Sequence, residues 1–289
     1  MRHAFLICAH NNFNLLERLI CQLDDPSFDC YVHIDKKAGG FDYEHFERLP
    51  QHSKVYFLRK RISVLWGDVS QIEVTFRLIE EALKNGKYNY LHFISGVDFP
   101  IKSNKYIKNF FQINNGKEFV GFSSWTPVLD FKLGKYHIVP RDYQNKYKWL
   151  EKVYSFSLAI QNKLHISHFK NTHTFSKGCN WWSITGNLAT DILSCRRELE
   201  KKYRYTLCAD EVFFQTYVMG NNRYKDAIYD KHDEYKGCLR LINWERGNPY
   251  VWKDSDFDEL MNSSAIFARK FSEDNMTLID KLQEELKKK

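Results

Sequence analysis

The stretch Ala4-Phe5-Leu6-Ile7-Cys8-Ala9, close to the start of this 289-residue chain, is an unbroken apolar run. A run of this kind predicts a β-strand that is buried on both faces, as strands are in a parallel sheet covered by helices. His10-Asn11-Asn12 ends the run, and from Leu15 to Leu23 leucine and isoleucine recur at helical spacing. The chain therefore begins with a predicted strand and a predicted amphipathic helix.

The same alternation continues through the first 122 residues. Helical spacing returns around Ile72–Leu83 and Ile107–Phe111. Further apolar runs predict strands at Cys30–Ile34, Val55–Leu58, Tyr90–Ile94 and Phe119–Phe122. This order predicts an α/β fold with a mainly parallel central sheet and helices on both faces. In such sheets ligands bind beyond the carboxyl ends of the strands, where Asp35 and Asp98 fall, although either carboxylate could instead cap a turn or helix.

Beyond residue 122 the alternation weakens as far as about residue 171, without a repeat and without a linker rich in Pro, Gly or Ser. We therefore predict a single domain over residues 1–289, with an insertion at 123–175. Later elements are predicted as helices at Tyr147–Leu164, Leu188–Leu199 and Thr277–Lys288, and as strands at Trp181-Trp182 and Leu239–Trp244.

The composition is that of a globular protein, with 43% hydrophobic and 27% charged residues. The net charge of +7 favours anionic partners such as nucleotide phosphates. Because the Lys and Arg residues are scattered along the chain, a dedicated nucleic-acid-binding protein is not expected. The 16% share of aromatic residues suits a hydrophobic core and also stacking on sugars.

The seven cysteines form no Cys-x-x-Cys pair. This predicts buried free thiols rather than a disulfide framework or a zinc site. No apolar stretch approaches the roughly 18 residues of a membrane span. We expect a cytoplasmic protein, or one that is peripheral at the inner face of a membrane.

Missing motifs exclude several common chemistries. The chain has no P-loop, no Gly-x-Gly-x-x-Gly, no Gly-x-Ser-x-Gly and no His-Glu-x-x-His. Asp-x-Asp, which can hold a divalent metal against a diphosphate, occurs only within Asp254-Ser255-Asp256-Phe257-Asp258, where the carboxylates suit a helix N-terminus better. Without a metal, basic side chains must offset the charge of a departing diphosphate, and Arg240, Arg269 and Lys270 are the candidates.

An acidic pair, Asp210-Glu211, stands at the head of the apolar run Val212–Thr216. A carboxylate here could act as a general base, or the pair could simply stabilise a helix N-terminus. About thirty residues earlier lies the tryptophan-rich segment Lys177–Thr185. If Trp181 and Trp182 lie on a strand they point to opposite faces, so one is expected in the core and the other could line a sugar pocket.

Several of these segments occur in an order that resembles one known family. They are Tyr31–Lys36, Val64–Ser70, Ser95–Lys102, Gly178–Thr185, Asp210–Phe214 and Phe267–Phe271, preceded by His10 and the helix that follows it. Over nearly the whole chain the sequence is similar to the core-2/I-branching β-1,6-N-acetylglucosaminyltransferases and peptide O-xylosyltransferases of glycosyltransferase family 14. Animal members carry a membrane anchor and disulfides; since this sequence shows neither, it resembles a bacterial-type, cytoplasmic member.

The resemblance implies a GT-A-like nucleotide-sugar-binding fold. Residues 1–122 would form the nucleotide-binding half, 123–175 would include the acceptor region, and 176–289 would form the catalytic and diphosphate-binding half. The implied reaction uses a UDP-sugar, most often of N-acetylglucosamine or xylose, and inverts the anomeric carbon without a metal or other cofactor. The implied partners are the donor and a glycan or glycolipid acceptor. From the composition we expect no nucleic-acid partner and at most a peripheral contact with a membrane.

The resemblance also implies roles for single residues. Glu211 inherits the role of general base. The implied donor-binding residues are Ala9, Asp35, Trp66, Asp98, Arg240 and Lys270. The residues assigned to the acceptor are Trp125, Arg141, Trp181 and Trp182.

Two other function classes remain open at the level of sequence. A nucleotide- or carbohydrate-binding protein with an inactive site would bind UDP without turnover. A glycoside hydrolase would need two carboxylates roughly 5–9.5 Å apart across the scissile bond. Asp210 and Glu211 are adjacent, so their side chains diverge, and no second partner is evident.

Overall fold

A six-stranded sheet forms the centre of the fold in the computed structural model, which describes residues 1–288. Its strands are β1 (His3–Ala9), β2 (Phe28–Ile34), β3 (Lys54–Phe57), β4 (Tyr90–Ser95), β6 (Phe119–Val120) and β7 (Trp182–Thr185). They lie in the order β3-β2-β1-β4-β7-β6, and the first four pair in parallel, whereas β7 is antiparallel to both of its neighbours. The α/β fold with a mainly parallel sheet is thus confirmed.

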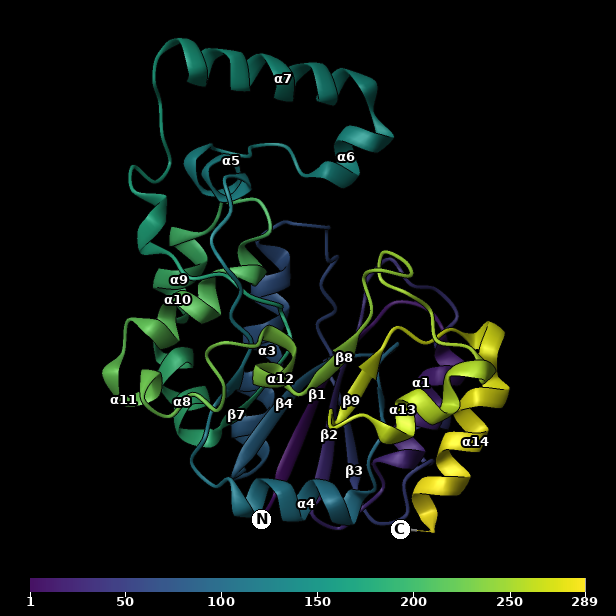
Figure 1. The fold of residues 1–289 in the computed structure, drawn as a ribbon. Helices are drawn as coiled ribbons and strands as arrows, with labels where there is room; N and C mark the ends of the chain where they lie inside the picture. The colour runs from purple at the N-terminus through teal and green to yellow at the C-terminus, as the bar shows by residue number, and fades with distance from the viewer. Residues whose placement is uncertain (289) are drawn as a thin grey trace.

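Helices cover both faces of the sheet, as predicted (Figure 1). One face carries α3 (Ser70–Asn85), α8 (Gly186–Ser194), α9 (Arg196–Lys202) and α10 (Phe213–Met219), and the other carries α1 (Phe13–Gln22), α4 (Asn104–Ile113), α13 (Phe257–Asn262) and α14 (Met276–Lys287). Each face of the sheet packs with its helices into a hydrophobic core, and strand β1 contributes side chains to both cores. Leu6 packs on the face covered by α3, and Phe5 and Ile7 pack on the face covered by α1. The single helix predicted at Leu188–Leu199 is wrong: it is two helices, since Cys195 has φ −89° and ψ 4°, outside the helical region.

A second sheet has three strands of only two or three residues, and one of them, β8 (Arg240–Ile242), confirms the strand predicted at Leu239–Trp244, whereas the other two were not predicted. It consists of β5 (Phe99–Pro100), β9 (Phe267–Arg269) and β8 (Arg240–Ile242), in that order. The backbone N–H of Phe271 donates to the carbonyl of Val97 at 3.0 Å, next to the turn that follows β4. The C-terminal segment is thereby held beside the carboxyl end of β4, in the nucleotide-binding half of the predicted domain.

The predicted insertion forms the end of the molecule that lies at the top of Figure 1. It contains α5 (Val128–Gly134), α6 (Arg141–Lys146) and α7 (Lys148–Lys163), and α7 confirms the helix predicted at Tyr147–Leu164. The remaining short elements are α2 (Tyr43–Glu47), α11 (Asn222–Lys225), α12 (Glu234–Cys238) and 3-10 turns at Thr172–Thr174, Ala209–Glu211, Asp254–Asp256 and Glu273–Asn275. Within residues 1–288, no helix combines the length and the hydropathy that crossing a bilayer requires.

The cysteines are only partly as predicted. All seven are free thiols, but only Cys30, Cys208 and Cys238 are buried. Cys21 is exposed, because it lies on α1 away from the buried face formed by Leu15, Leu19 and their neighbours.

Candidate active site

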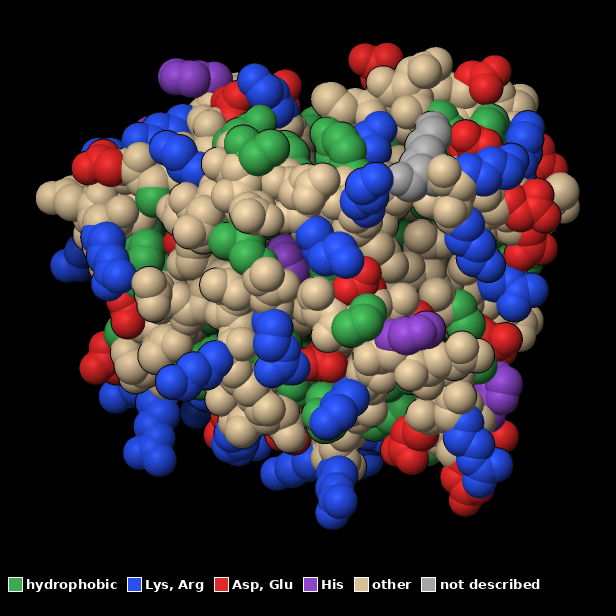
Figure 2. Space-filling model, turned by 90° about the horizontal axis from the view of Figure 1, so that it is seen from below, with side chains coloured by type: hydrophobic (Ala, Val, Ile, Leu, Met, Phe, Trp, Pro, Cys, Tyr) green, Lys and Arg blue, Asp and Glu red, His purple; other side chains and the backbone are tan. Residues whose placement is uncertain are grey.

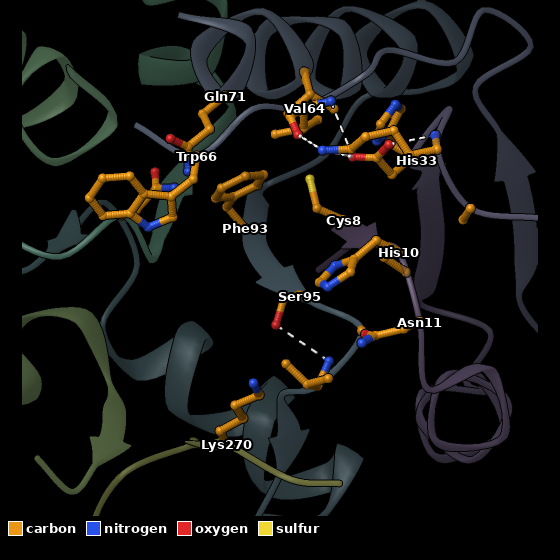
Figure 3. A pocket seen from close by; sticks show the side chains of 18 of the residues that line it. Cys8, His10, Asn11, His33, Val64, Trp66, Gln71, Phe93, Ser95 and Lys270 are labelled. Carbon is orange, nitrogen blue, oxygen red and sulfur yellow. Dashed lines mark hydrogen bonds and ion pairs between the residues drawn. The ribbon is translucent and has the colours of Figure 1, made fainter. Parts of the chain in front are cut away.

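A cavity of about 620 Å³ lies at the carboxyl ends of β1, β2 and β4. Its walls come from the residues that end each strand and from the loops that follow them (Figure 3). The lining residues include Cys8, Ala9, His10, Asn11, His33, Asp35, Lys37, Val64, Trp66, Gln71, Phe93, Ser95, Asp142, Asn180, Trp181, Arg269 and Lys270. The cavity therefore occupies the place where an open parallel sheet binds its ligands, and it contains the predicted donor residues Ala9, Asp35, Trp66 and Lys270.

Asp35 fixes the wall of the cavity at the end of β2. Its carboxylate accepts hydrogen bonds from the backbone N–H groups of Lys37 at 2.7 Å and Val64 at 3.1 Å, and its side chain is almost fully buried. These bonds tie the loop after β3 to the end of β2. A carboxylate has about four lone-pair sites, so Asp35 keeps acceptor capacity for a ligand donor in the cavity.

Trp66 forms the outer part of the same wall and is half exposed. The guanidinium of Arg141 lies 4.7 Å from the centroid of its indole ring. Asp142, the next residue of α6, lines the cavity and lies 3.5 Å from the ammonium of Lys37. Arg141, predicted to bind the acceptor, is thus placed against the donor-side tryptophan, and α6 forms part of the cavity rim.

Two consecutive basic residues close the other side of the cavity. Lys270 lies across the cavity from Trp66 in the close view (Figure 3). The guanidinium of Arg269 lies 4.1 Å from the ring centroid of Trp181, and its Nε is 3.2 Å from Oδ1 of Asp98. Arg269 and Lys270 are therefore two of the cations that line the cavity, and Lys37 on the opposite wall is another.

Arg240 and Asp98 lie behind this wall rather than in the cavity. Arg240 is 1% exposed, and its guanidinium donates to the carbonyls of Cys238 at 2.6 Å, Phe93 at 3.2 Å and Trp182 at 3.3 Å. Asp98 is fully buried and accepts from the backbone N–H of Ser95 at 2.7 Å. The structure therefore does not support direct donor contact by either residue: β8 holds Arg240 inside the fold, and the turn after β4 holds Asp98 under Arg269.

The three tryptophans assigned to the acceptor occupy different environments. Trp182 is fully buried and stacks on Phe93 and Phe214, with centroids 5.2 and 4.9 Å apart. Trp181, one residue earlier, lines the cavity. The prediction that one member of the pair is a core residue is confirmed. That residue is Trp182, so its assignment to the acceptor is not supported. Trp125 does not line the cavity. Its ring stacks on that of His173, with ring centroids 4.2 Å apart.

Glu211 lies in the 3-10 turn Ala209–Glu211, which precedes α10. Its carboxylate does not cap α10; it forms an ion pair with Lys132 of α5 at 2.8 Å. Both side chains are partly accessible, Glu211 at 33% and Lys132 at 16%. Burial lowers the pKa of Lys132, but the charge of Glu211 and its hydrogen bond to the ammonium, together with neighbouring groups, outweigh burial, so the pKa is raised. Lys132 and Glu211 therefore form a close ion pair that joins α5 to the turn before α10.

Glu211 does not line the cavity itself, but its turn is bound to two loops that do. The carbonyl of Glu211 accepts from the N–H of Gly178 at 2.9 Å, two residues before Asn180. The N–H of Cys208 donates to the carbonyl of Gly67 at 2.8 Å, next to Trp66. Gly178 must be glycine, because a Cβ there would lie 1.9 Å from the carbonyl oxygen of Gly121. The backbone thus ties the turn that carries Glu211 to the segments that precede Asn180 and follow Trp66.

Asp210, by contrast, is withdrawn from solvent. It is 6% exposed, and its Oδ1 has no hydrogen-bond partner. Burial, followed by the charge of Glu211, raises the pKa of Asp210 to about 7. Two adjacent carboxylates therefore have different environments, and the buried one favours its neutral form, which reduces repulsion against Glu211.

The raised pKa of Asp210 should appear in the pH dependence of stability. Its folded-state pKa of about 7 exceeds the ordinary value of 3.8, so the folded state binds the extra proton between these values. Protonated Asp210 therefore adds to the free energy of unfolding, by an amount on the order of 2–4 kcal/mol. This addition is complete below about pH 4 and is lost as the pH rises through about 7. We expect Asp210→Asn to remove this slope from the free energy of unfolding, as measured with urea at each pH. Equal slopes in the two proteins would contradict the assignment.

Some residues of the site could not be selected from sequence. Lys132 lies 79 residues from Glu211, in the irregular insertion, and no pattern marks it. His10, Asn11 and Ser95 line the cavity because they follow or end β1 and β4, and their positions at the carboxyl ends of predicted strands were an available signal.

The Asp-x-Asp segment has a structural role. The carboxylate of Asp256 accepts from the N–H of Lys253 at 2.8 Å and from the hydroxyl of Tyr250 at 3.0 Å, and it pairs with Arg246 at 3.1 Å. This supports the capping interpretation. Within residues 1–288, no group of three His, Cys, Asp or Glu side chains is arranged to hold a metal ion.

The chain was compared with protein-family models and with the sequences of known proteins. The family model of the Core-2/I-Branching enzyme matches residues 3–260. The chain is 24% identical to xylosyltransferase oxt of Drosophila melanogaster, 23% to xylosyltransferase sqv-6 of Caenorhabditis elegans and 22% to human xylosyltransferase 2; each match covers 94% of this chain and 32%, 34% and 32% of the relative. The chain thus spans about a third of the length of these relatives.

Solved structures were also compared. Apo mouse xyloside xylosyltransferase 1 is 10% identical with a TM-score of 0.39, over 92% of this chain and 96% of that protein. S. aureus TarS is 15% identical with a TM-score of 0.29, over 49% of this chain and 26% of that protein.

Proposed function

This chain belongs to the Core-2/I-branching enzyme family, a family of glycosyltransferases, and we propose that it transfers a sugar from a UDP-sugar to an acceptor hydroxyl with inversion of the anomeric carbon. The observation that carries this proposal is the cavity at the strand ends, with Asp35 and Trp66 on one side and Arg269 and Lys270 on the other. A nucleoside diphosphate has a base and ribose that need hydrogen-bond acceptors and an aromatic surface, and phosphates that need cations.

The proposed chemistry is a single displacement. Glu211 accepts the proton of an acceptor hydroxyl, the oxygen forms a bond to the anomeric carbon, and the bond between that carbon and the phosphate oxygen of UDP breaks. Arg269 and Lys270 stabilise the negative charge that develops on the leaving diphosphate. We assign no step to a metal ion, since two side-chain cations are available for this charge.

Residues at the edge of the site have proposed supporting roles. Trp181 lines the cavity and is the candidate for stacking on the sugar. Lys132 keeps Glu211 oriented through its ion pair. Arg240, buried behind the wall, holds β8 against the main sheet rather than binding the donor. The donor sugar, N-acetylglucosamine or xylose, and a glycan or glycolipid acceptor are carried over from the family.

A thermal-shift screen of UDP-sugars in excess EDTA tests both the donor class and the absence of a metal. At a hundredfold excess over Kd, a bound donor should stabilise the fold by about 2.7 kcal/mol, which raises the Tm by about 5 °C for a chain of this size. GDP-sugars at the same concentration are the control. We expect transfer to persist in EDTA.

Each alternative has its own outcome in the same assays. Loss of transfer in EDTA with rescue by manganese would contradict metal independence. UDP binding without transfer to any acceptor in a panel would indicate an inactive binding protein. Cleavage of a glycoside in the absence of a UDP-sugar would indicate a hydrolase.

A further inference from the structure

Exposed hydrophobic side chains are concentrated in one part of the surface. Of the seventeen large ones within the described residues, eleven lie between Val128 and Ile166. The opposite end of the molecule differs: seen from below, it shows interspersed acidic and basic side chains and only small, separate hydrophobic groups (Figure 2). Exposed apolar area gathered at one place marks an interaction surface rather than ordinary surface scatter.

Helix α7 carries the main part of this area. Trp149, Val153, Phe156, Ile160 and Leu164 are all exposed and are separated by four, three, four and four residues. At 3.6 residues per turn this spacing places them along one side of the helix. We call these five residues the α7 stripe. Trp149 and Phe156 are its most exposed members, at 64% and 68%.

The stripe faces away from the rest of the protein. The described contacts of α7 with the insertion beneath it come from other positions on the helix. The amide of Gln161, the one buried residue of α7, bonds to both backbone groups of Tyr136, at 2.8 and 3.0 Å. The hydroxyl of Tyr154 bonds to Nδ1 of His137 at 2.7 Å. Because Tyr154 and Gln161 lie about 100° around the helix from the stripe, the stripe is free to contact a partner.

The charges around the stripe are mainly positive. Between residues 141 and 170 there are six basic and two acidic residues, a net charge of +4. All six basic side chains are exposed, and they are Arg141, Lys146, Lys148, Lys152, Lys163 and Lys170. Tyr143, Tyr147 and Trp149 gather near the start of α7 and are exposed as well. Aromatic side chains with a polar tip, next to lysines, favour the boundary between water and lipid.

We propose that the α7 stripe docks into the surface of an anionic bilayer, with α7 lying in the plane of the membrane. An exposed apolar stripe that contains Trp and Phe and is flanked by lysines is the pattern of an interfacial helix. Each lysine adds attraction to anionic headgroups. A second copy of this chain is a less favourable partner for the stripe. Pairing two stripes would bring Lys152 and Lys163 of one copy close to the lysines of the other, and these like charges would repel each other.

Docking in this way would place the cavity beside the membrane. Helix α6 directly precedes α7, and Asp142 of α6 lines the cavity while Arg141 covers Trp66. If the proposed function holds, an acceptor sugar carried by a membrane lipid could then reach the site without leaving the bilayer surface. The membrane contact itself does not depend on the transfer reaction.

Vesicle flotation without any sugar nucleotide tests the docking separately from catalysis. The full chain is mixed with vesicles of phosphatidylcholine, with or without phosphatidylglycerol. We expect binding to the anionic vesicles, and the double variant Trp149→Ser/Phe156→Ser should lower the partition coefficient by about tenfold or more. Lys152→Glu/Lys163→Glu should weaken binding to anionic vesicles only. The matched control is Tyr106→Ser/Ile113→Ser, which removes two exposed hydrophobic side chains from α4.

The results of this experiment distinguish a membrane from a second copy of the chain as the partner of the α7 stripe. Unchanged Tm values show that the variants fold, since all substituted side chains are exposed. Absence of wild-type binding to anionic vesicles overturns the proposal, as does binding that survives the Trp149/Phe156 change. A dimer that dissociates in that double variant, without vesicle binding, would assign the stripe to a second copy instead.

Discussion

Glu211→Gln is expected to lower the transfer rate by about 10²–10⁴-fold while leaving UDP affinity nearly unchanged. The substitution keeps the size of the side chain and removes its ability to accept a proton from the acceptor hydroxyl. The nucleotide should still bind, because the cavity residues Asp35, Trp66 and Lys270 are untouched. Initial rates of transfer and a UDP titration by calorimetry measure the two effects on the same protein.

Glu80→Gln provides a matched control for this variant. Glu80 on α3 pairs with Lys84 at 3.0 Å and with Arg196 of α9 at 2.9 Å, and its side chain is 32% exposed, close to the 33% of Glu211. It does not line the cavity. Loss of a partly exposed ion pair changes stability by less than about 1 kcal/mol, so Glu80→Gln should stay folded and keep full activity although it removes two such pairs. A Glu211→Gln protein that retained most of its transfer rate would show that another group is the base.

The fold could be predicted from sequence because three of its strands, β1, β2 and β4, have six or seven residues that are mostly apolar and almost all buried. The run Ala4–Ala9 is buried on both faces, and this leaves no alternation to confuse with an amphipathic strand. Of the second sheet only β8 was predicted, within Leu239–Trp244; β5 and β9 were missed, since they have two or three residues each and depend on tertiary contacts. The antiparallel direction of β7 also depends on a chain path through the irregular insertion.

The site was predictable where it follows strand ends and unpredictable where it depends on side-chain direction. Asp35, predicted at the end of β2, lines the cavity, but Asp98, predicted on the same ground after β4, is buried behind the cavity wall. Trp66, which the family resemblance indicated, also lines the cavity. The adjacent pairs were harder to resolve: Trp181 and Trp182, like Asp210 and Glu211, differ in burial although they are neighbours in sequence. Sequence spacing does not reveal which member of such a pair is buried unless the strand or turn that carries the pair is already known.

The basic residues give the second large expected effect. Lys270→Met should lower kcat/KM by about 10²–10³-fold, because it removes a preorganised positive charge from the place where the diphosphate charge develops. UDP affinity should fall as well, and the stability of the fold should not, since Lys270 faces the cavity. Steady-state kinetics, UDP titration and urea unfolding give the three quantities. Lys36→Met, which removes an exposed charge outside the cavity lining, controls for the change in net charge.

Arg240→Met should be compared with Lys270→Met, because the family resemblance and the structure give Arg240 different roles. The resemblance implies that Arg240 binds the donor, whereas the structure places it inside the fold. The structure predicts a loss of about 3 kcal/mol in unfolding free energy, since three buried carbonyls lose the guanidinium that donates to them. A folded Arg240→Met protein should still bind UDP, because Arg269 and Lys270 remain in the cavity. If this variant were fully stable and had lost UDP binding, Arg240 would be a donor ligand, and the wall of the cavity would have to rearrange when UDP binds. The two variants together therefore distinguish a charge that contacts the diphosphate from a charge that holds the wall in place.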